Sequence, residues 1–205
     1  MKQIAVIGGG TMGNGIVHVF AQNGYAVNLI DVKQDMLDKA MATIQKNMDR
    51  QIAKGSLTED DKAKAMANIK CFTQLAEGVS NADLVIEAAT ENQDLKVKIL
   101  KQLDGMLAPE VIIASNTSSI SITQLAAVTK RADRFIGMHF FNPVPMMALV
   151  EIIRGLQTSD ETHDAVHALA TALGKTPITV KNAPGFVVNR ILVPMINEAL
   201  FVLSE

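Results

Sequence analysis

One stretch near the N-terminus constrains the fold more than any other part of the chain. Residues 4–31 read IAVIGGGTMGNGIVHVFAQNGYAVNLID: an apolar run, a glycine cluster, a segment with helical apolar periodicity, a second apolar run and a final aspartate. Gly8, Gly10 and Gly13 satisfy the pattern G-x-G-x-x-G. The pattern alone is weak. A buried strand before it and a helix after it, ending near Gly24, indicate a strand-helix-strand unit that binds a dinucleotide.

Each of the three glycines has a geometric reason in such a unit. Gly8 permits a tight turn from strand to helix, Gly10 leaves no side chain between backbone and ligand, and Gly13 lets the helix sit close to the strand. A pyrophosphate placed at Thr11 and Met12, where the helix opens, would meet unpaired N–H groups and the positive end of the helix dipole. The alternative is a glycine-rich turn that packs a helix tightly and binds no ligand.

An acidic residue at the end of the second apolar run indicates which dinucleotide is bound. Asp31 lies 18 residues after Gly13, where a carboxylate can accept hydrogen bonds from the adenosine ribose hydroxyls. The 2′-phosphate of NADP would meet a like charge there, and Val32 and Lys33 follow in place of an arginine. The sequence therefore predicts NAD as the cofactor.

Composition excludes several classes of partner. The 205 residues allow one or two domains, and 48% hydrophobic with 20% charged residues is ordinary for a packed protein. A formal net charge of −2 gives no electrostatic reason to expect nucleic acid or an anionic membrane as the partner. No apolar run is long enough for a membrane span or a secretion signal, and the single Cys71 excludes an internal disulfide. We therefore expect a cytoplasmic protein.

A helical hairpin is predicted directly after Asp31. A helical pattern runs over residues 34–54, Gly55 breaks it, and Thr58 makes a suitable cap for a second helix that reaches about Ala67. The hairpin, within residues 34–68, is thus inserted between the second and third strands of the sheet. The apolar stripe of its first helix consists of Leu37, Met41, Ile44, Met48 and Ile52.

Three cations recur at every fourth position of the first hairpin helix: Lys46, Arg50 and Lys54. Such a stripe is usually just a solvated helix face. The alternative is a binding surface for a polyanionic ligand, for example a phosphorylated adenosine. Spacing alone does not choose between the two.

Two later apolar runs, residues 83–88 and 111–115, each read as a buried parallel strand and end in a polar loop. Open α/β sheets bind ligands at the carboxyl ends of their strands, so these loops should lie near the nicotinamide half of the cofactor and a substrate oxygen. The alternative is that the same side chains cap helices or are solvated. The candidate contact residues are Glu91, Lys96, Asn116 and Ser118.

The segment most suited to chemistry is residues 135–153, where two apolar runs flank a proline-containing turn and predict an antiparallel pair. If the pair is symmetric about Pro145, His139 lies opposite Glu151. A histidine in an apolar run is more often a satisfied core residue than a catalyst. A carboxylate placed across from it favours the second interpretation, because a buried acid needs a partner and such a pair stabilises the imidazolium of a general base.

The remaining histidine pair, His163 and His167, superficially resembles part of a zinc-protease helix. A third ligand is missing and the helix is polar, so we predict no metal site. A domain boundary is expected after residue 183, where Asn182 would cap a helix, Pro184 would start it, and one helix would run from Phe186 to the end.

The predicted fold is therefore α/β, a Rossmann-type doubly wound and mostly parallel sheet with an inserted α-hairpin and the start of a C-terminal helical domain. Residues 1–183 would form the NAD-binding domain. Residues 184–205 would form the first helix of an all-α domain.

Five motifs together resemble the 3-hydroxyacyl-CoA dehydrogenase family over essentially all 205 positions. They are GGGTMG, EAATEN, SNTSSI, HFFNPVPMMALVEII and NAPGFVVNRIL. The resemblance implies an NAD-dependent enzyme that interconverts short-chain (S)-3-hydroxyacyl-CoA and 3-oxoacyl-CoA, in fatty acid β-oxidation or butyrate metabolism.

The resemblance also implies roles for single residues. It makes His139 the catalytic histidine, Glu151 the glutamate that orients it, Ser118 a contact of the substrate oxygen and Asn189 a neighbour of the thioester carbonyl. It places CoA against the inserted hairpin, which favours Lys54 and less directly Lys46 and Arg50, although Asp49 stands near the family's serine there. The implied cofactor contacts are Gly8, Gly10, Gly13, Asp31, Glu91, Lys96 and Asn142.

Members of this family continue into further helices that close the acyl site and form a homodimer. We therefore expect apolar surface on the helix that ends at Glu205, and impaired activity in a chain without those helices. Two rival functions stay open. One is a dehydrogenase of free β-hydroxy acids, although such enzymes generally rely on a lysine base; the other is a nucleotide-binding protein without turnover.

Overall fold

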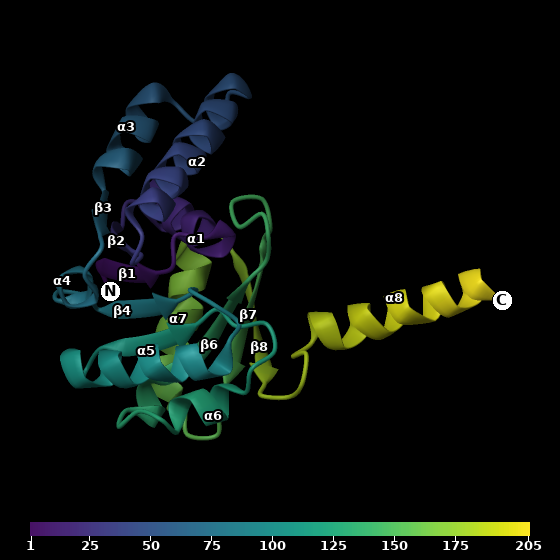
Figure 1. The fold of residues 1–205 in the computed structure, drawn as a ribbon. Helices are drawn as coiled ribbons and strands as arrows, with labels where there is room; N and C mark the ends of the chain where they lie inside the picture. The colour runs from purple at the N-terminus through teal and green to yellow at the C-terminus, as the bar shows by residue number, and fades with distance from the viewer.

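The computed structural model describes residues 1–205, and one eight-stranded sheet forms its centre (Figure 1). The strands are β1 (Gln3–Ile7), β2 (Ala26–Ile30), β3 (Ile69–Phe72), β4 (Leu84–Glu87), β5 (Ile112–Ser115), β6 (Phe135–Phe140), β7 (Leu149–Arg154) and β8 (Thr176–Lys181). Their order across the sheet is β3-β2-β1-β4-β5-β6-β7-β8. The first six are parallel to one another, β7 is antiparallel to β6, and β8 is parallel to β7. This is the strand order of a Rossmann fold, so the predicted fold class is confirmed.

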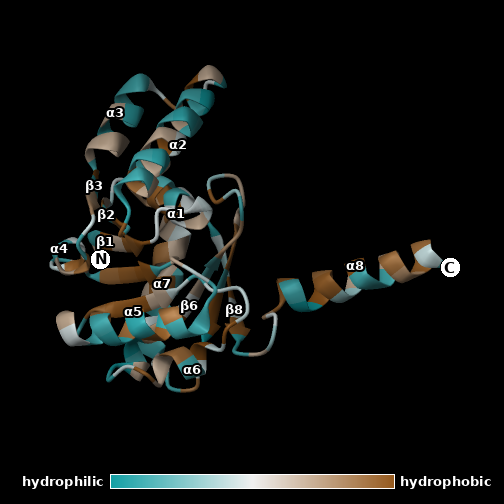
Figure 2. Ribbon diagram, in the orientation of Figure 1, coloured by the Kyte–Doolittle hydropathy of each residue, from teal (hydrophilic) through white to brown (hydrophobic).

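Helices cover both faces of the sheet. They are α1 (Thr11–Gln22), α2 (Gln34–Ala53), α3 (Glu59–Ala67), α4 (Leu75–Val79), α5 (Gln93–Met106), α6 (Ile122–Ala126), α7 (Asp160–Ala172) and α8 (Val188–Ser204), with a 3-10 turn at Ala132–Arg134. One apolar core lies between the sheet and α1, α2 and α7, and a second lies between the opposite face and α4, α5 and α6. Ile4 and Val6 of β1 enter the first core while Ala5 and Ile7 enter the second, as expected of a strand buried on both faces. The central strands of the sheet are correspondingly coloured hydrophobic in Figure 2.

The inserted hairpin is present as predicted, formed by α2 and α3 beyond the β3 end of the sheet (Figure 1). The Thr58 hydroxyl accepts a hydrogen bond from the Asp61 N–H at 3.1 Å, which caps α3. Lys62 of α3 forms an ion pair with Asp49 of α2 and joins the two helices. Of the predicted apolar stripe, Leu37, Ile44 and Met48 are buried, whereas Met41 and Ile52 are only half-buried.

The predicted antiparallel pair is confirmed residue by residue. In the β6–β7 ladder, His139 faces Glu151 and Phe140 faces Val150, which is the register symmetric about Pro145. Because β6 is parallel to β5 and its C-terminal end lies at the same edge as the ends of β1 and β4, the pair is delivered to the ligand-binding edge of the sheet.

The start of the last helix differs from the sequence prediction. α8 begins at Val188, whereas the prediction started the helix at Pro184 and included Phe186 in it. Gly185 and Phe186 have positive φ angles of 74° and 53°, which end any helical path before Val188. The Phe186 side chain is 3% exposed and packs in the second core, so it is not part of the exposed face of α8.

The prediction that Asn182 caps the last helix is also wrong. Its side-chain oxygen accepts the Ile122 N–H at 2.9 Å, and its amide donates to the hydroxyls of Ser121 and Thr123, both at 2.9 Å. Asn182 therefore fixes the end of β8 to the N-terminus of α6. The reason is tertiary, because the turn after β8 passes directly beside α6.

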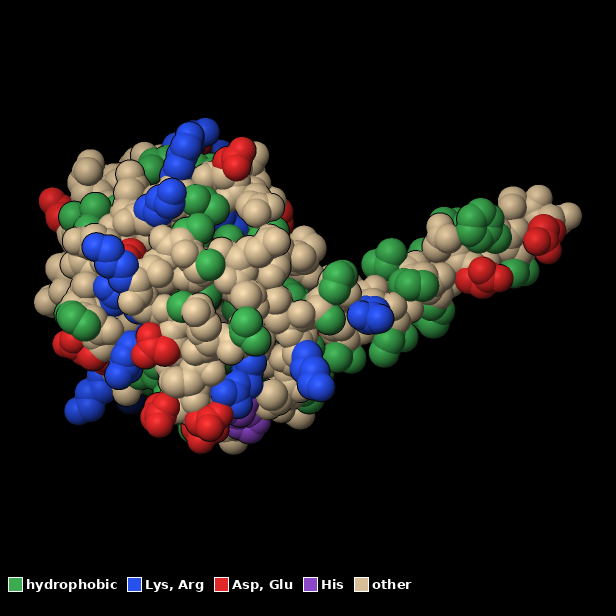
Figure 3. Space-filling model, turned by 90° about the horizontal axis from the view of Figure 1, so that it is seen from below, with side chains coloured by type: hydrophobic (Ala, Val, Ile, Leu, Met, Phe, Trp, Pro, Cys, Tyr) green, Lys and Arg blue, Asp and Glu red, His purple; other side chains and the backbone are tan.

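The body of α8 projects away from the sheet (Figure 1), and none of its residues is buried. Apolar side chains lie on its surface along its length (Figure 3), as the sequence predicted. They include Ile191, Leu192, Val193, Met195, Ile196, Leu200, Phe201, Val202 and Leu203. None of the helices combines the length and apolar character that a membrane span requires.

Candidate active site

The turn between β1 and α1 has the geometry of a phosphate cradle. Gly8 has φ 106°, and a Cβ on Gly13 would lie 1.7 Å from the Gly8 carbonyl oxygen, so this helix can approach the turn only with glycine there. A Cβ on Gly10, in contrast, would meet no protein atom within 4 Å. Packing of the protein therefore does not require glycine at position 10. Close approach of the protein backbone to a bound pyrophosphate does require it.

Two further features of this turn fit a dinucleotide. No side chain caps the N-terminus of α1, so its first N–H groups are available to a pyrophosphate. The Gly10 turn, with Thr11 and Met12, lines one cavity together with the loops after β4 and β5. The predicted cofactor residues Glu91, Lys96 and Asn116 line the same cavity, so the structure brings these candidates together.

Asp31 stands at the end of β2, on the other side of the glycine turn. Its carboxylate accepts the Gly9 N–H at 2.8 Å and the Lys33 N–H at 3.0 Å, which fixes its position. The hydrogen bond to Gly9 was not anticipated from the sequence. A largely apolar cavity lies beside Asp31, lined by Ile30, Leu95 and their neighbours, and it is suited to the adenine and ribose of a dinucleotide.

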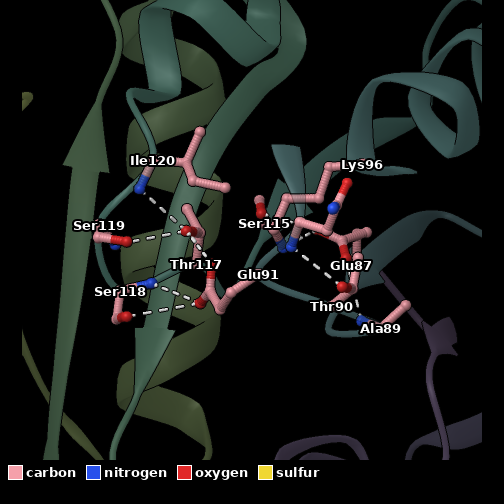
Figure 4. Close-up of polar contacts among 11 residues, drawn as sticks. Glu87, Ala89, Thr90, Glu91, Lys96, Ser115, Thr117, Ser118, Ser119 and Ile120 are labelled. Carbon is pink, nitrogen blue, oxygen red and sulfur yellow. Dashed lines mark hydrogen bonds and ion pairs between the residues drawn. The ribbon is translucent and has the colours of Figure 1, made fainter. Parts of the chain in front are cut away.

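Glu91 joins the loops after β4 and β5 (Figure 4). Its carboxylate accepts the Thr117 hydroxyl at 2.7 Å and the Ser118 N–H at 3.0 Å. The cap of α6 is Ser121, whose hydroxyl accepts the Gln124 N–H at 3.3 Å. The hydroxyls of the loop after β5, residues 115–119, therefore do not cap α6. The alternative interpretation of this loop as a helix cap is wrong.

Lys96 is a buried residue with one carboxylate partner. Its Nζ lies 2.5 Å from Glu87 Oε2, and the Ser115 hydroxyl donates to the same oxygen at 2.9 Å (Figure 4). The other Glu87 oxygen accepts the Ala89 N–H at 3.0 Å. Lys96 is 1% exposed and Glu87 is fully buried, so removing either partner would leave a buried charge, at a cost of about 3–5 kcal/mol.

Sequence reasoning missed Glu87, which supports the floor of the cofactor cavity. The signal was present, because a glutamate at the end of the apolar run 83–88 must find a cation or several donors if that run is a buried strand. The buried ion pair with Glu87 also excludes the interpretation of Lys96 as a solvated lysine.

His139 and Glu151 form a buried pair. His139 Nδ1 lies 2.7 Å from Glu151 Oε2, while Glu151 Oε1 accepts the N–H groups of Val187 and Val188 at 2.9 and 3.0 Å. Burial raises the pKa of Glu151, but the hydrogen bonds from His139, Val188 and Val187 outweigh it and hold this pKa below its ordinary value. The carboxylate is therefore ionised at neutral pH, and Nε2 is the ring nitrogen that can exchange a proton with a ligand.

Asn116 connects this pair to the cofactor cavity. Its side-chain oxygen accepts the Phe140 N–H at 2.9 Å, so the loop after β5 is fixed to the strand that carries His139. The rings of Phe141 and Phe186 contact His139, with centroid separations of 4.5 and 5.8 Å. The histidine thus lies between the cofactor cavity and the start of α8.

The other predicted residues occupy the periphery. Ser118 is half-buried in the loop after β5, Asn142 is exposed just after β6, and Asn189 is half-buried in the first turn of α8. Lys46 and Arg50 of α2 and Lys54, directly after it, are exposed and form no ion pair; Arg50 has only a 3.4 Å hydrogen bond to Asn47.

The structure offers no grouping suited to a metal ion. His163 Nδ1 hydrogen-bonds with Asp164 and its Nε2 with the Thr179 hydroxyl, both at 2.8 Å, so both ring nitrogens have partners. No three His, Cys, Asp or Glu side chains of the chain lie close enough together to hold a cation.

Comparison with known proteins identifies the family. Residues 3–183 match the family model described as the NAD-binding domain of 3-hydroxyacyl-CoA dehydrogenase. The chain belongs to the 3-hydroxyacyl-CoA dehydrogenase family. Its NAD cofactor, predicted from the glycines and Asp31, is confirmed by this match.

Individual relatives support the same family assignment. The chain is 50% identical to a 3-hydroxybutyryl-CoA dehydrogenase of Bradyrhizobium diazoefficiens, covering all of this chain and 70% of that protein. It is 44% identical to the human mitochondrial hydroxyacyl-coenzyme A dehydrogenase, covering 98% of this chain and 65% of that one. The crystal structure of an (S)-3-hydroxybutyryl-CoA dehydrogenase from Ralstonia eutropha superposes with a TM-score of 0.97 at 63% identity, over all of this chain and 72% of the other. These matches support assignment of the protein as an NAD-binding dehydrogenase of this family.

Alanine substitutions at two glycines should separate folding of this dehydrogenase from cofactor binding. Gly13→Ala should lower the free energy of unfolding by at least about 2 kcal/mol, because the new Cβ meets a backbone oxygen. Gly10→Ala should change it by less than about 1 kcal/mol and yet weaken NADH binding at least about tenfold. Urea unfolding and NADH fluorescence titration measure the two effects. Wild-type affinity for NADH in Gly10→Ala would contradict the assignment of the cradle.

Proposed function

We propose that this dehydrogenase interconverts short-chain (S)-3-hydroxyacyl-CoA and 3-oxoacyl-CoA, with 3-hydroxybutyryl-CoA and acetoacetyl-CoA as its substrate pair. The single observation that carries the proposal is the 2.7 Å contact between His139 Nδ1 and Glu151, on the strand next to the loops of the cofactor cavity. The similarity to 3-hydroxybutyryl-CoA dehydrogenases of Bradyrhizobium diazoefficiens and Ralstonia eutropha supports this choice of substrate.

In this proposal His139 is the general base of alcohol oxidation. Its Nε2 takes the proton of the C3 hydroxyl, and the ionised Glu151 stabilises the imidazolium that forms. The nicotinamide of bound NAD would supply the acceptor for the hydride that leaves C3 of the substrate. In the reverse direction His139 returns its proton to the C3 oxygen, so the same pair serves both directions.

The other predicted residues would hold ligands in place. Ser118 would bind the C3 oxygen, since its hydroxyl lies in the loop that Glu91 fixes, and Asn189 would bind the thioester carbonyl from the start of α8. The residues proposed to hold NAD are Gly8, Gly10, Thr11, Met12, Gly13, Asp31, Glu91, Lys96, Asn116, Ser118 and Asn142. Lys96 would act here as a wall of the cavity, because its ammonium group is paired with Glu87.

The cations of α2 would bind the phosphates of CoA. Lys46, Arg50 and Lys54 are all exposed and have no acidic partner, although α2 also carries Asp49, which pairs with Lys62 instead. A stripe of cations that form no ion pair favours a phosphorylated ligand over a purely structural charge pattern.

A free β-hydroxy acid is the rival substrate, and the fold alone does not exclude it. A diketoreductase structure shares this fold with a TM-score of 0.93 at 32% identity. The base expected for free-acid enzymes is a lysine, and Lys96, the lysine of the cofactor cavity, is paired with buried Glu87. This favours the CoA thioester.

The proposal includes a homodimer in the cytoplasm, acting in fatty acid β-oxidation or butyrate metabolism. The exposed apolar side chains of α8, which include Ile191, Leu200 and Phe201, support an association surface. The free and exposed Cys71 is consistent with a reducing compartment.

Replacement of the histidine tests the proposed chemistry. His139→Gln should lower acetoacetyl-CoA-dependent oxidation of NADH by at least about a hundredfold, because it removes the group that transfers the proton. NADH binding should stay within about twofold, since the glycine turn is untouched. His167→Gln, on α7, is the matched control and should retain wild-type turnover. A His139→Gln enzyme with the wild-type rate would remove this residue from the mechanism.

Charge reversal on α2 tests the CoA surface. Lys54→Glu should raise KM for acetoacetyl-CoA at least about tenfold, with smaller effects for Arg50→Glu and Lys46→Glu, while kcat changes little. The effect should shrink with added salt and disappear with acetoacetyl-pantetheine, which lacks the phosphorylated adenosine. Lys101→Glu on α5 is the control. Equal KM changes for the CoA and pantetheine substrates would contradict the assignment.

A further inference from the structure

The connection between β8 and α8, residues 182–188, is fixed to the body of the protein at both ends. At its start, the Asn182 side chain makes three hydrogen bonds to the N-terminus of α6, one with the Ile122 N–H and two with hydroxyls. At its end, the N–H groups of Val187 and Val188 donate to Glu151 Oε1. The acid that pairs with His139 is thus also the attachment point of α8.

Phe186 lies between these two attachment points in an unusual backbone conformation. It is the one non-glycine residue of the chain with positive φ, at 53°. L side chains rarely adopt this conformation, which persists only where the surrounding structure imposes it. Here the surroundings are the second core, in which the side chain is 3% exposed, and the His139 ring, whose centroid lies 5.8 Å away at an interplanar angle of 60°.

The backbone turn at Phe186 has a direct consequence for Glu151. By reversing direction at Gly185 and Phe186, the chain aims two successive N–H groups at one carboxylate oxygen. The second oxygen is then left for His139 Nδ1. Glu151 is fully buried, so without these two N–H groups its charge would have the imidazole as its only hydrogen-bond partner.

We propose that Phe186 is a positioning residue of the dehydrogenase: its buried ring holds the 182–188 connection so that Val187 and Val188 fix Glu151 and the ring edge fixes the His139 imidazole. This inference rests on the proposed role of His139. It assigns to the start of α8 a part in assembling the proton-transfer pair, in addition to carrying Asn189. Phe186 itself touches neither proton nor substrate in this account.

The test separates the ring from the backbone conformation. Phe186→Gly keeps the positive φ accessible and removes only the side chain. We expect kcat for acetoacetyl-CoA reduction to fall at least about tenfold, because the pair loses its alignment, while KM for NADH stays within about twofold. Phe186→Tyr, which keeps the ring, should restore kcat to within about threefold of the wild type. Phe186→Leu keeps an apolar side chain but not the ring edge, and its kcat should lie between those of the glycine and tyrosine variants. It replaces the glycine variant if that variant does not fold.

A second readout does not depend on turnover. Carbon-13 NMR of the Glu151 carboxyl should show its pKa rising toward the ordinary value in Phe186→Gly, since two of its three donors are displaced. Phe135→Leu, a truncation in the same core at the other end of β6, is the matched control. It should lower stability without changing kcat or the Glu151 titration.

The outcomes distinguish this inference from the proposed function. Wild-type kcat and Glu151 titration in Phe186→Gly, or losses no larger than those of Phe135→Leu, would overturn the positioning role. If His139→Gln were inactive while Phe186→Gly behaved as the wild type, only the inference would fail. Wild-type turnover in His139→Gln would instead overturn the proposed function, and the NMR titration would still decide whether Phe186 orders Glu151.

Discussion

Glu151 has no exposed surface, and its carboxylate is surrounded by His139 Nδ1 and the N–H groups of Val187 and Val188. A buried charge of this kind is tolerated only if hydrogen bonds replace the lost water. Those bonds connect three elements: β7 carries the acid, β6 carries the histidine, and the start of α8 provides the amides. The need to compensate one charge therefore determines how the reactive imidazole is oriented and where the last helix leaves the sheet.

The glycine turn and a second buried charge shape the other half of the site. Gly13 permits contact between α1 and the turn, and Gly10 leaves the space that the cofactor requires. Below the cavity, Glu87 is compensated by Lys96 and Ser115, and through the Ala89 N–H it also holds the backbone that packs against Gly8 (Figure 4). Both buried acids thus lie at the carboxyl edge of the sheet, where Rossmann folds bind their ligands.

Much of this could be predicted because the signals are local. The glycine spacing, the acid after β2 and the turn-centred symmetry that pairs His139 with Glu151 can each be read within about thirty residues. The cap provided by Asn182 could not, because its partner Ile122 is 60 positions away and lies beside it only in the folded chain. Phe186 likewise reads as the first residue of an apolar helix. In the folded chain its backbone has positive φ instead, and the N–H groups that follow it donate to Glu151. The role of Glu87 could have been predicted, since a carboxylate in a buried strand requires a partner.

The central claim is that His139 Nε2 exchanges the proton of the substrate C3 oxygen at the edge where the coenzyme binds. A crystal structure of the protein with NAD and 3-hydroxybutyryl-CoA measures this most directly. We expect the C3 oxygen within hydrogen-bond reach of His139 Nε2, at about 2.6–3.2 Å, with Glu151 still bonded to Nδ1. A substrate whose C3 oxygen contacts a lysine, or that binds on the far side of the sheet from His139, would contradict it.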